Sequence, residues 1–215
     1  HCSVLIFNIL GKSNENYKIN DSELRDSSLI IKNLIETLNQ LKLNSQNDLD
    51  LSKIIELWND AKKFKEDSFN GFRLGFASLQ ERALAEKIHW ACAKEIANII
   101  EIEGIEHSDL KDINKILAST YYANFSIFQS TPDTWAINQV FPIIPIHRHK
   151  EKPLINATFA DLTCDSDGKL NNFINNGNIK TLLKLHELID NQEYYIGIFL
   201  AGAYQEALGL SLIHI

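Results

Sequence analysis

Hydrophobic and polar positions along this chain change their period twice, and the change predicts a helical region between two β regions. Residues 3–10 form a short apolar run rich in Val, Ile, Leu and Phe, which is typical of a strand buried on at least one face. Apolar side chains then recur at helical spacing as far as residue 119. We therefore predict an α+β fold, in which a helical bundle at 20–119 is inserted into a β domain made of residues 1–19 and 120–215.

Start and stop signals divide the inserted region into helices. Asp21 or Ser22 can cap the first helix, and Gly104 can end the third. Gly71 and Gly75 lie among aromatic residues, where a bent helix or a close helix crossing is expected. Helices are expected at residues 21–41, from 51 to at least 64, at 78–100 and at 108–117.

In the last third of the chain, turn residues separate short segments whose pattern predicts strands. Pro142 and Pro145 exclude a regular helix from the apolar stretch at 141–146. Residues 194–200 form a buried strand that ends near Gly202. Extended segments are expected at 125–128, 141–146, 155–162, 183–186 and 194–200. The strand at 3–10 is expected to join this β region.

Composition excludes several functional classes. A hydrophobic fraction of 45% allows a sizeable core, and a formal net charge of −7 without a long Lys/Arg cluster argues against nucleic acid or an anionic membrane as partner. No apolar run approaches the roughly 20 residues of a membrane span, and no signal peptide is evident. Three distant cysteines predict a reducing compartment such as the cytoplasm. Both ends of the chain suggest an internal segment of a longer protein.

The most reactive combination of side chains lies at residues 160–168, with the sequence ADLTCDSDG. Cys164 is a mobile acid near neutral pH, and the adjoining Asp165 could bind a cation. A lone cysteine is commonly a small buried residue, and an aspartate in a glycine-ended loop is commonly a solvated turn residue. Asp167 fits turn formation or an interface ion pair. The carboxylates and the glycine that surround Cys164 in this block favour a functional role for its thiol.

Other candidate groups have weaker support. His147 and His149 would share one face of an extended segment, so a metal site is geometrically feasible. No third strong ligand is evident, and basic neighbours disfavour a cation, so a solvated loop is the favoured interpretation. His89, Trp90 and Cys92 fall within a helix and are expected to be packing residues. No metal-binding residue is therefore predicted.

Several ordered blocks together resemble a known family. They are NFSIFQSTPDTWAINQ at 124–139, FPIIPIHR at 141–148, DLTCDSDGK at 161–169, GAYQE at 202–206, and, in the helical region, LQERALAE at 79–86 and HWAC at 89–92. Their order and the helical insertion are similar to biosynthetic arginine decarboxylases, whose fold belongs to the alanine-racemase-like group. The resemblance covers nearly all of residues 1–208, whereas residues 208–215 depart from the pattern.

The resemblance implies part of an enzyme dependent on pyridoxal 5'-phosphate that converts L-arginine to agmatine and CO2, early in polyamine and spermidine synthesis. This chain would form a sandwich-like or barrel-like C-terminal β domain with its helical insertion. The (β/α)8 barrel, with the lysine that holds the cofactor, would lie outside the chain, so the chain alone should be inactive. Magnesium and a homodimer or larger homo-oligomer are further expectations.

The resemblance also implies roles for three residues. Cys164 would return a proton to Cα after CO2 leaves, acting on the neighbouring subunit's cofactor across a dimer interface. Asp165 would bind the guanidinium group of the substrate, and Tyr204 would lie against the cofactor near its phosphate. Without the family, Tyr204 could equally be a core aromatic residue.

Three alternatives to this function remain open. The first is a decarboxylase of another basic amino acid, such as ornithine or diaminopimelate. The second is a catalytically inactive paralogue that regulates an active partner. The third is a helical interaction module with an incidental β region, which would leave Cys164 and its adjoining acid unexplained.

Overall fold

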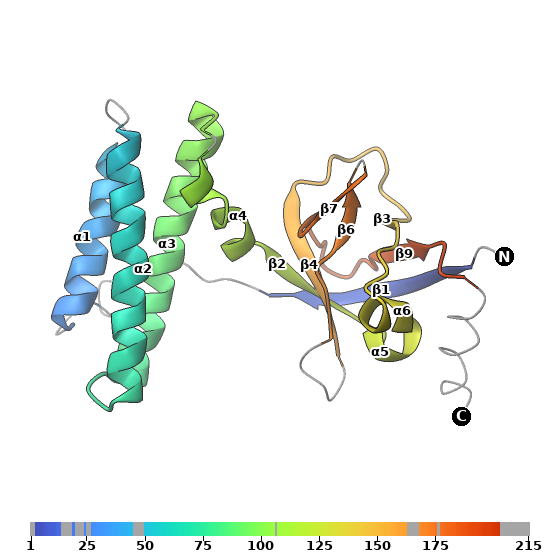
Figure 1. Ribbon diagram of the computed structural model, residues 1–215, viewed down its shortest axis with the longest axis horizontal. Coiled ribbons are helices and arrows are strands. Elements are labelled where there is room, and N and C mark those ends of the chain that lie inside the picture. The colour runs from blue at the N-terminus through green and yellow to red at the C-terminus, as the bar shows by residue number, and fades with distance from the viewer. Residues whose placement is uncertain are drawn as a thin grey trace. The chain divides into compact units, whose positions relative to one another are not determined.

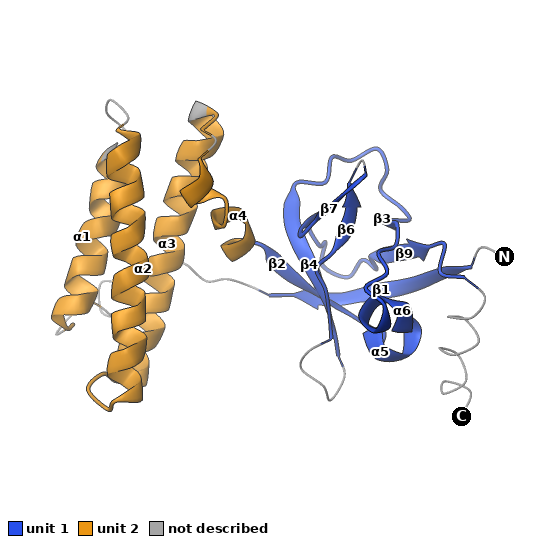
Figure 2. Cartoon of the chain, in the orientation of Figure 1, with its two compact units in different colours: residues 1–14, 118–215 blue, residues 15–117 orange. Residues whose placement is uncertain are grey.

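A computed structural model of the chain describes residues 3–13, 19, 24, 27–44, 50–105, 107–162, 168–175 and 177–202. The chain forms two compact units, shown in separate colours in Figure 2. Residues 1–14 and 118–215 make the β unit, and residues 15–117 make the helical unit. The predicted α+β class, with helices inserted into a β region, is confirmed.

Three long helices dominate the helical unit (Figure 1). They are α1 (Leu29–Asn44), α2 (Leu51–Arg73) and α3 (Leu79–Glu103), followed by the short 3-10 helix η2 (Ser108–Leu110) and by α4 (Ile113–Ile116). None of the helices that the structure describes is long and apolar enough to cross a membrane.

Local sequence determines where the long helices begin and end. The Asp50 carboxylate accepts hydrogen bonds from the first backbone amides of α2. Ser78 and Glu81 form a reciprocal capping box at the start of α3. Gly104 ends α3 in the left-handed conformation, with φ 64°, which glycine adopts without a steric penalty. The predicted limits of the second and third helices are therefore largely correct.

Two helix predictions need correction. The first helix begins at Leu29, because Ser27 and Ser28 are not helical, and the Ser28 carbonyl accepts the first helical hydrogen bond, from Lys32 N. The proposed caps at residues 21 and 22 lie outside the described residues. The fourth helix is divided into η2 and α4, since residues 111 and 112 form a turn between them.

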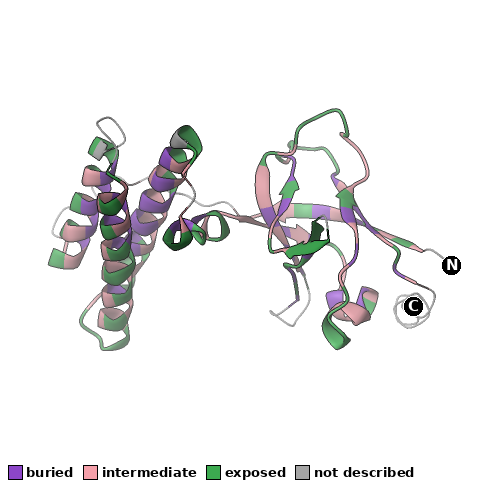
Figure 3. Cartoon of the chain, turned by 45° about the horizontal axis from the view of Figure 1, so that its top comes forward, coloured by how far each residue is buried: buried purple, intermediate pink, exposed green. Residues whose placement is uncertain are grey.

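Facing sides of the three helices supply the core of the helical unit, which Figure 3 shows as purple stripes along them. Trp58 and His89 are both fully buried and stack with ring centroids 4.9 Å apart. Burial, together with Lys65 and Lys62, lowers the pKa of His89 from 6.5 to about 4. His89 is therefore neutral at physiological pH and packs in the core, as predicted.

The buried histidine should make the helical unit sensitive to acid. An unfolded His89 takes up a proton near pH 6.5, whereas the folded residue does so only near pH 4, so the free energy of unfolding should fall as pH decreases between these values. The loss should reach about 3 kcal/mol. Urea unfolding at pH 7 and pH 4.5, followed by Trp58 fluorescence, measures it. His89→Phe should flatten the pH dependence; equal losses in both proteins would contradict the assignment.

The β unit is built on one curled, mixed sheet (Figure 1). Its strands run in the order β3-β9-β1-β2-β4-β5, and β8 also pairs with β4. Their bounds are β1 (Val4–Lys12), β2 (Ser119–Ala123), β3 (Ile143–Pro145), β4 (Ile155–Asp161), β5 (Lys169–Leu170), β8 (Leu183–Leu185) and β9 (Tyr195–Phe199). A separate hairpin contains β6 (Phe173–Asn175) and β7 (Asn178–Lys180).

Strand direction decides where functional residues can gather. The strand β1 is antiparallel to both β2 and β9, and β2 is parallel to β4. The strands β2, β4 and β9 therefore run in the same direction, toward a side of the sheet that we call the carboxyl edge. The ends of β2 and β4 lie level with Ile9 of β1, whereas β9 ends opposite Val4, five residues further toward that side. Beneath it the core holds the large buried side chains of Tyr121, Phe159 and Phe173.

After β2 the chain forms two single-turn helices, α5 (Ile127–Ser130) and α6 (Pro132–Ala136). The predicted extended segment at 125–128 is wrong in its second half. The Ser126 side chain accepts a hydrogen bond from Gln129 N at 3.3 Å, which favours a helical start over continued alternation. Pro132 occupies the first turn of α6, where its missing N–H costs nothing.

His147 of the histidine pair follows β3 and lies beside the start of β9. His147 Nε2 accepts a hydrogen bond from Tyr195 N at 2.9 Å, so this ring is a structural acceptor rather than a solvated loop residue. Burial and the nearby Arg148 lower the pKa of His147, which keeps the ring neutral for that contact. Within the described part of the chain, no three His, Cys, Asp or Glu residues are grouped to hold a metal ion.

Candidate active-site edge

The three residues with expected roles follow two of the strands that end at the carboxyl edge. Cys164 and Asp165 come after β4, and Tyr204 comes after β9. All three, with Asp167, lie outside the described residues. The structure does describe the residues that hold both segments, from Asp161 and Gly168 on one side to Gly202 on the other.

Asp161 joins three parts of this edge. Its Oδ2 accepts a hydrogen bond from Ile127 N at 2.9 Å, which links the end of β4 to the start of α5. Its backbone N donates to the carbonyl of Gly168 at 2.9 Å, which closes the base of the segment 162–167. The residue is only 9% exposed, so an unpaired carboxylate there would be costly. Asp161 therefore fixes where the segment leaves the sheet and where it returns.

Gly168 lies directly against this carboxylate. A Cβ built on Gly168 would overlap the side-chain carboxylate atoms of Asp161. Since these are the atoms that hold α5, only glycine leaves the three-way contact intact. Gly168 is therefore needed because a side chain would not fit there, and not only because it ends a turn.

The helices α5 and α6 extend the carboxyl edge from β2. Thr131 is fully buried, and its Oγ1 donates to the carbonyl of Ile127 at 3.0 Å. Trp135 Nε1 donates to the carbonyl of Phe128 at 3.4 Å, which leaves the indole ring at the surface. Thr134 Oγ1 is buried and makes no hydrogen bond to any residue that the structure describes. These contacts give the STPDTW block a defined local fold beside Asp161.

At the end of β9 the chain turns sharply before residue 203. Leu200 and Gly202 both have positive φ values, 63° and 72°. The turn is held to the start of β1, because Ala201 N donates to the carbonyl of Ser3 at 3.2 Å and Ser3 Oγ donates to the carbonyl of Gly202 at 3.3 Å. The small residues before Tyr204 therefore lie in a turn that only a glycine adopts freely at its last position.

Large apolar side chains are exposed in the segments that follow these strands. Trp135, Ile137, Leu162 and Leu200 are each more than half exposed. These side chains, in the segments after β2, β4 and β9, are available for contact with another part of a protein.

One other cysteine can be assessed directly. Cys92 is fully buried in the helical unit, and burial raises the pKa of its thiol to about 12. It is therefore an inert packing residue, as the sequence predicted, and cannot serve as an acid near neutral pH.

Sequence reasoning did not assign a role to Asp161. The available signal was an aspartate at the last position of a strand, seven residues before a glycine, within the same block as the thiol. Its partner, Ile127 N, is 34 residues away along the chain, so the contact depends on the parallel pairing of β2 with β4.

Comparison with known proteins agrees with this picture. Residues 25–114 match the family described as the arginine decarboxylase helical bundle domain. The chain is 66% identical over 209 residues to the biosynthetic arginine decarboxylase of Prochlorococcus marinus subsp. pastoris, and 49% identical to that of Synechococcus sp. strain RCC307. These alignments cover 97% of the chain but only 32% and 31% of the two relatives.

A solved structure shows the same arrangement. The crystal structure of the biosynthetic arginine decarboxylase from Campylobacter jejuni is similar with a TM-score of 0.72 and 30% identity. The match covers 97% of this chain and 31% of that chain. The chain thus spans about a third of the length of the relatives it matches.

Proposed function

Since this chain belongs to the biosynthetic arginine decarboxylase family, of which it spans about a third, we propose that it supplies one side of a decarboxylase active site. The reaction would convert L-arginine to agmatine and CO2. Pyridoxal 5'-phosphate, held by a lysine elsewhere in the full-length enzyme, would supply the electron sink that makes loss of CO2 feasible.

Each candidate residue of this chain has a separate task in the proposal. Cys164 would deliver a proton to Cα of the substrate once CO2 has left, because a thiol exchanges its proton readily near neutral pH. Asp165 would bind the guanidinium group by two parallel hydrogen bonds and so select arginine. Tyr204 would pack against the cofactor near its phosphate. Asp161 would act only indirectly, by fixing both ends of the segment that carries Cys164 and Asp165.

The observation that carries the proposal is the direction of the strands at the carboxyl edge. Cys164 and Asp165 follow β4, Tyr204 follows β9, and both strands run toward the carboxyl edge. Three strand spacings separate β4 from β9, and their ends are offset by five residues along β1, which together correspond to roughly 20 Å at ordinary strand spacing and rise. That spacing supports different tasks for the thiol segment and for the tyrosine segment, rather than direct contact between them.

A composite site explains the apolar character of the same edge. Exposed side chains such as Leu162 and Leu200 would be buried when the edge meets the cofactor-binding part of the enzyme or of a second subunit. The proposal therefore includes a homodimer or larger homo-oligomer with the active site at the interface. Magnesium would have to be bound by residues outside those described here.

Substrate analysis of the full-length protein tests the proposal. With pyridoxal 5'-phosphate bound, arginine should be decarboxylated to agmatine with a kcat/KM at least about a hundredfold above the values for ornithine and diaminopimelate. The reason is that, of these three substrates, only arginine has a planar guanidinium group that can form two parallel hydrogen bonds with Asp165. Faster turnover of ornithine would assign the protein to a sister activity. Absence of turnover with every basic amino acid would favour a regulatory paralogue.

A further inference from the structure

A cavity of about 480 Å³ in the helical unit lies far in sequence from the residues proposed for catalysis. It is formed by side chains from α2, α3 and α4. The lining residues are Lys62, Lys65, Glu66, Phe69, Arg82, Glu86, His89 and Ile116. The proposed decarboxylation assigns no purpose to this cavity or to its charged side chains.

His89 is the least expected of these residues, because its polar ring is 98% buried. Its exposed fraction is 2%, and one ring face stacks on Trp58. Nδ1 is buried and makes no hydrogen bond to any residue that the structure describes. Buried polar atoms are nearly always paired, so an unpaired ring nitrogen in a cavity-lining residue points to a partner outside the protein.

The charges around the cavity identify the kind of partner. Lys65 lies 3.7 Å from Glu86 and is neutralised. Lys62 lies over the Trp58 ring, 5.7 Å from its centroid, and Arg82 lies over the Phe69 ring at 4.7 Å. No carboxylate among the described residues comes within ion-pair distance of either of these two cations.

Stacking leaves the hydrogen-bonding groups of both cations available. A guanidinium group packed face-on against an aromatic ring keeps the N–H groups at its edge free, and an ammonium group above a ring keeps its other donors free. Glu66 is the one remaining acid in the lining, so the cations exceed the acids by one charge. This balance suits a small anion and disfavours a polyanion such as nucleic acid.

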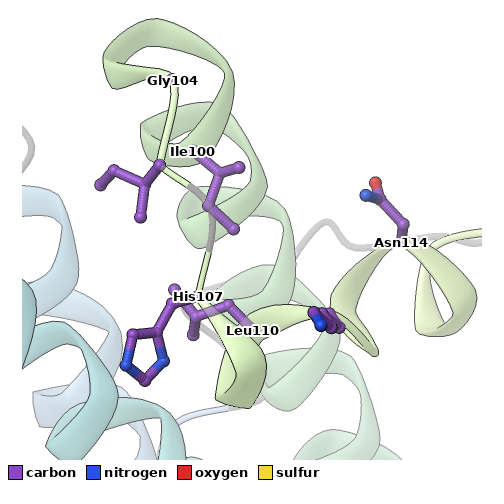
Figure 4. A pocket seen from close by; sticks show the side chains of 7 residues that line it. Ile100, Gly104, His107, Leu110 and Asn114 are labelled. Atoms are coloured by element: carbon purple, nitrogen blue, oxygen red, sulfur yellow. The ribbon is translucent and has the colours of Figure 1, made fainter.

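Another large cavity of the helical unit lacks these properties. It lies at the end of α3, has a volume of about 520 Å³, and is shown in Figure 4. His107 lines it, but His107 Nδ1 already accepts a hydrogen bond from Asp109 N at 3.3 Å. Ile100, Ile105 and Leu110 make much of its wall apolar. The cavity beside His89 is therefore the stronger candidate for a ligand.

We propose that the cavity beside His89 binds a small organic anion, whose carboxylate or phosphate group lies beside Lys62 and hydrogen-bonds to the imidazole, while Arg82 lies further along the cavity. Phe69 and Ile116 would contact the apolar part of the ligand. The proposal concerns the helical unit alone and does not depend on the decarboxylase activity. An anion next to His89 would also raise the pKa of its imidazole, because an adjacent negative charge favours the protonated form.

Titration of the 215-residue chain, followed by the NMR signals of the His89 ring, tests the site. Benzoate and phenyl phosphate share an aromatic ring and differ in their anionic group, and benzyl alcohol is a neutral analogue of both. We expect saturable shifts with at least one anion, a dissociation constant of about 1 mM or tighter, and none with benzyl alcohol. The pKa of His89 should rise when that anion is bound. Preference between the two anions identifies the group the cavity recognises.

Variants on the same helices distinguish a specific binding site from non-specific attraction by surface charge. Lys62→Gln should weaken binding at least about tenfold, since it removes a charged hydrogen bond. His89→Phe keeps the stack on Trp58 and should also weaken binding, which is followed by calorimetry because this variant lacks the His89 signals. Lys63→Gln removes the same charge from an exposed neighbour on α2 and should change nothing. The proposal is wrong if neither anion saturates, if benzyl alcohol binds equally well, or if Lys63→Gln weakens binding as much as Lys62→Gln.

Discussion

Replacing Cys164 with serine in the full-length enzyme is expected to lower kcat by about a hundredfold or more, while KM for arginine changes little. A serine hydroxyl occupies nearly the same space as a thiol but releases its proton far less readily, so the loss should fall on the proton-transfer step rather than on substrate binding. Steady-state kinetics with arginine, together with product analysis, measures both constants. Unchanged turnover would remove Cys164 from the mechanism.

Cys92 provides the matched control for that experiment. Its thiol is fully buried, with a pKa of about 12, and lies in the helical unit. Cys92→Ser places a hydroxyl in an apolar core and should lower stability while leaving kcat per folded molecule unchanged. If Cys92→Ser and Cys164→Ser reduced kcat equally, a specific role for the second thiol would be untenable.

Gly168→Ala should be the most damaging of the small substitutions at the carboxyl edge. The new methyl group would overlap the Asp161 carboxylate, which must then move and release Ile127 N inside the protein. We expect a loss of about 2 to 4 kcal/mol in the stability of this edge, from overpacking and a broken charged hydrogen bond. Hydrogen exchange of the amides in β4 measures this loss, and arginine turnover should fall with it.

A double-mutant cycle isolates the cause of that loss. In an Asp161→Ala background the carboxylate is absent, so adding Gly168→Ala should cost much less than it does in the wild-type chain. Gly11→Ala is the control for glycine substitution in this unit, because no atom lies within 4 Å of a Cβ built there. An equal cost for Gly168→Ala in both backgrounds would show that the overlap with Asp161 is not the reason.

Most of the helical unit could be predicted because its signals are local. Ser78, Glu81 and Gly104 mark the ends of α3 within a few residues of the positions they cap. The start of α1 could not be assigned in the same way, because several polar residues in succession can each cap a helix. In the structure the helix begins at Leu29, although Asp21 and Ser22 had suggested an earlier start.

The supports of the candidate site were harder to predict than the candidate residues. A thiol beside a carboxylate is visible in the sequence, but the contact of Asp161 with Ile127 N arises only when β2 and β4 pair in parallel. The same holds for the cavity beside His89, which combines residues from α2, α3 and α4. Periodicity identifies which helix face is buried, and it does not identify which polar group on that face lacks a partner.

The insertion point of the helices has a consequence for how such enzymes can diversify. Ser13, after β1, and Thr120, in β2, are joined by two hydrogen bonds, Ser13 N to the Thr120 carbonyl at 2.8 Å and Thr120 N to Ser13 Oγ at 3.0 Å. Residues 15–117 thus depart from and return to the tip of an ordinary antiparallel hairpin. A tight turn could replace them without shifting any strand, so evolution or an engineer could exchange this helical insertion while the carboxyl edge keeps its geometry.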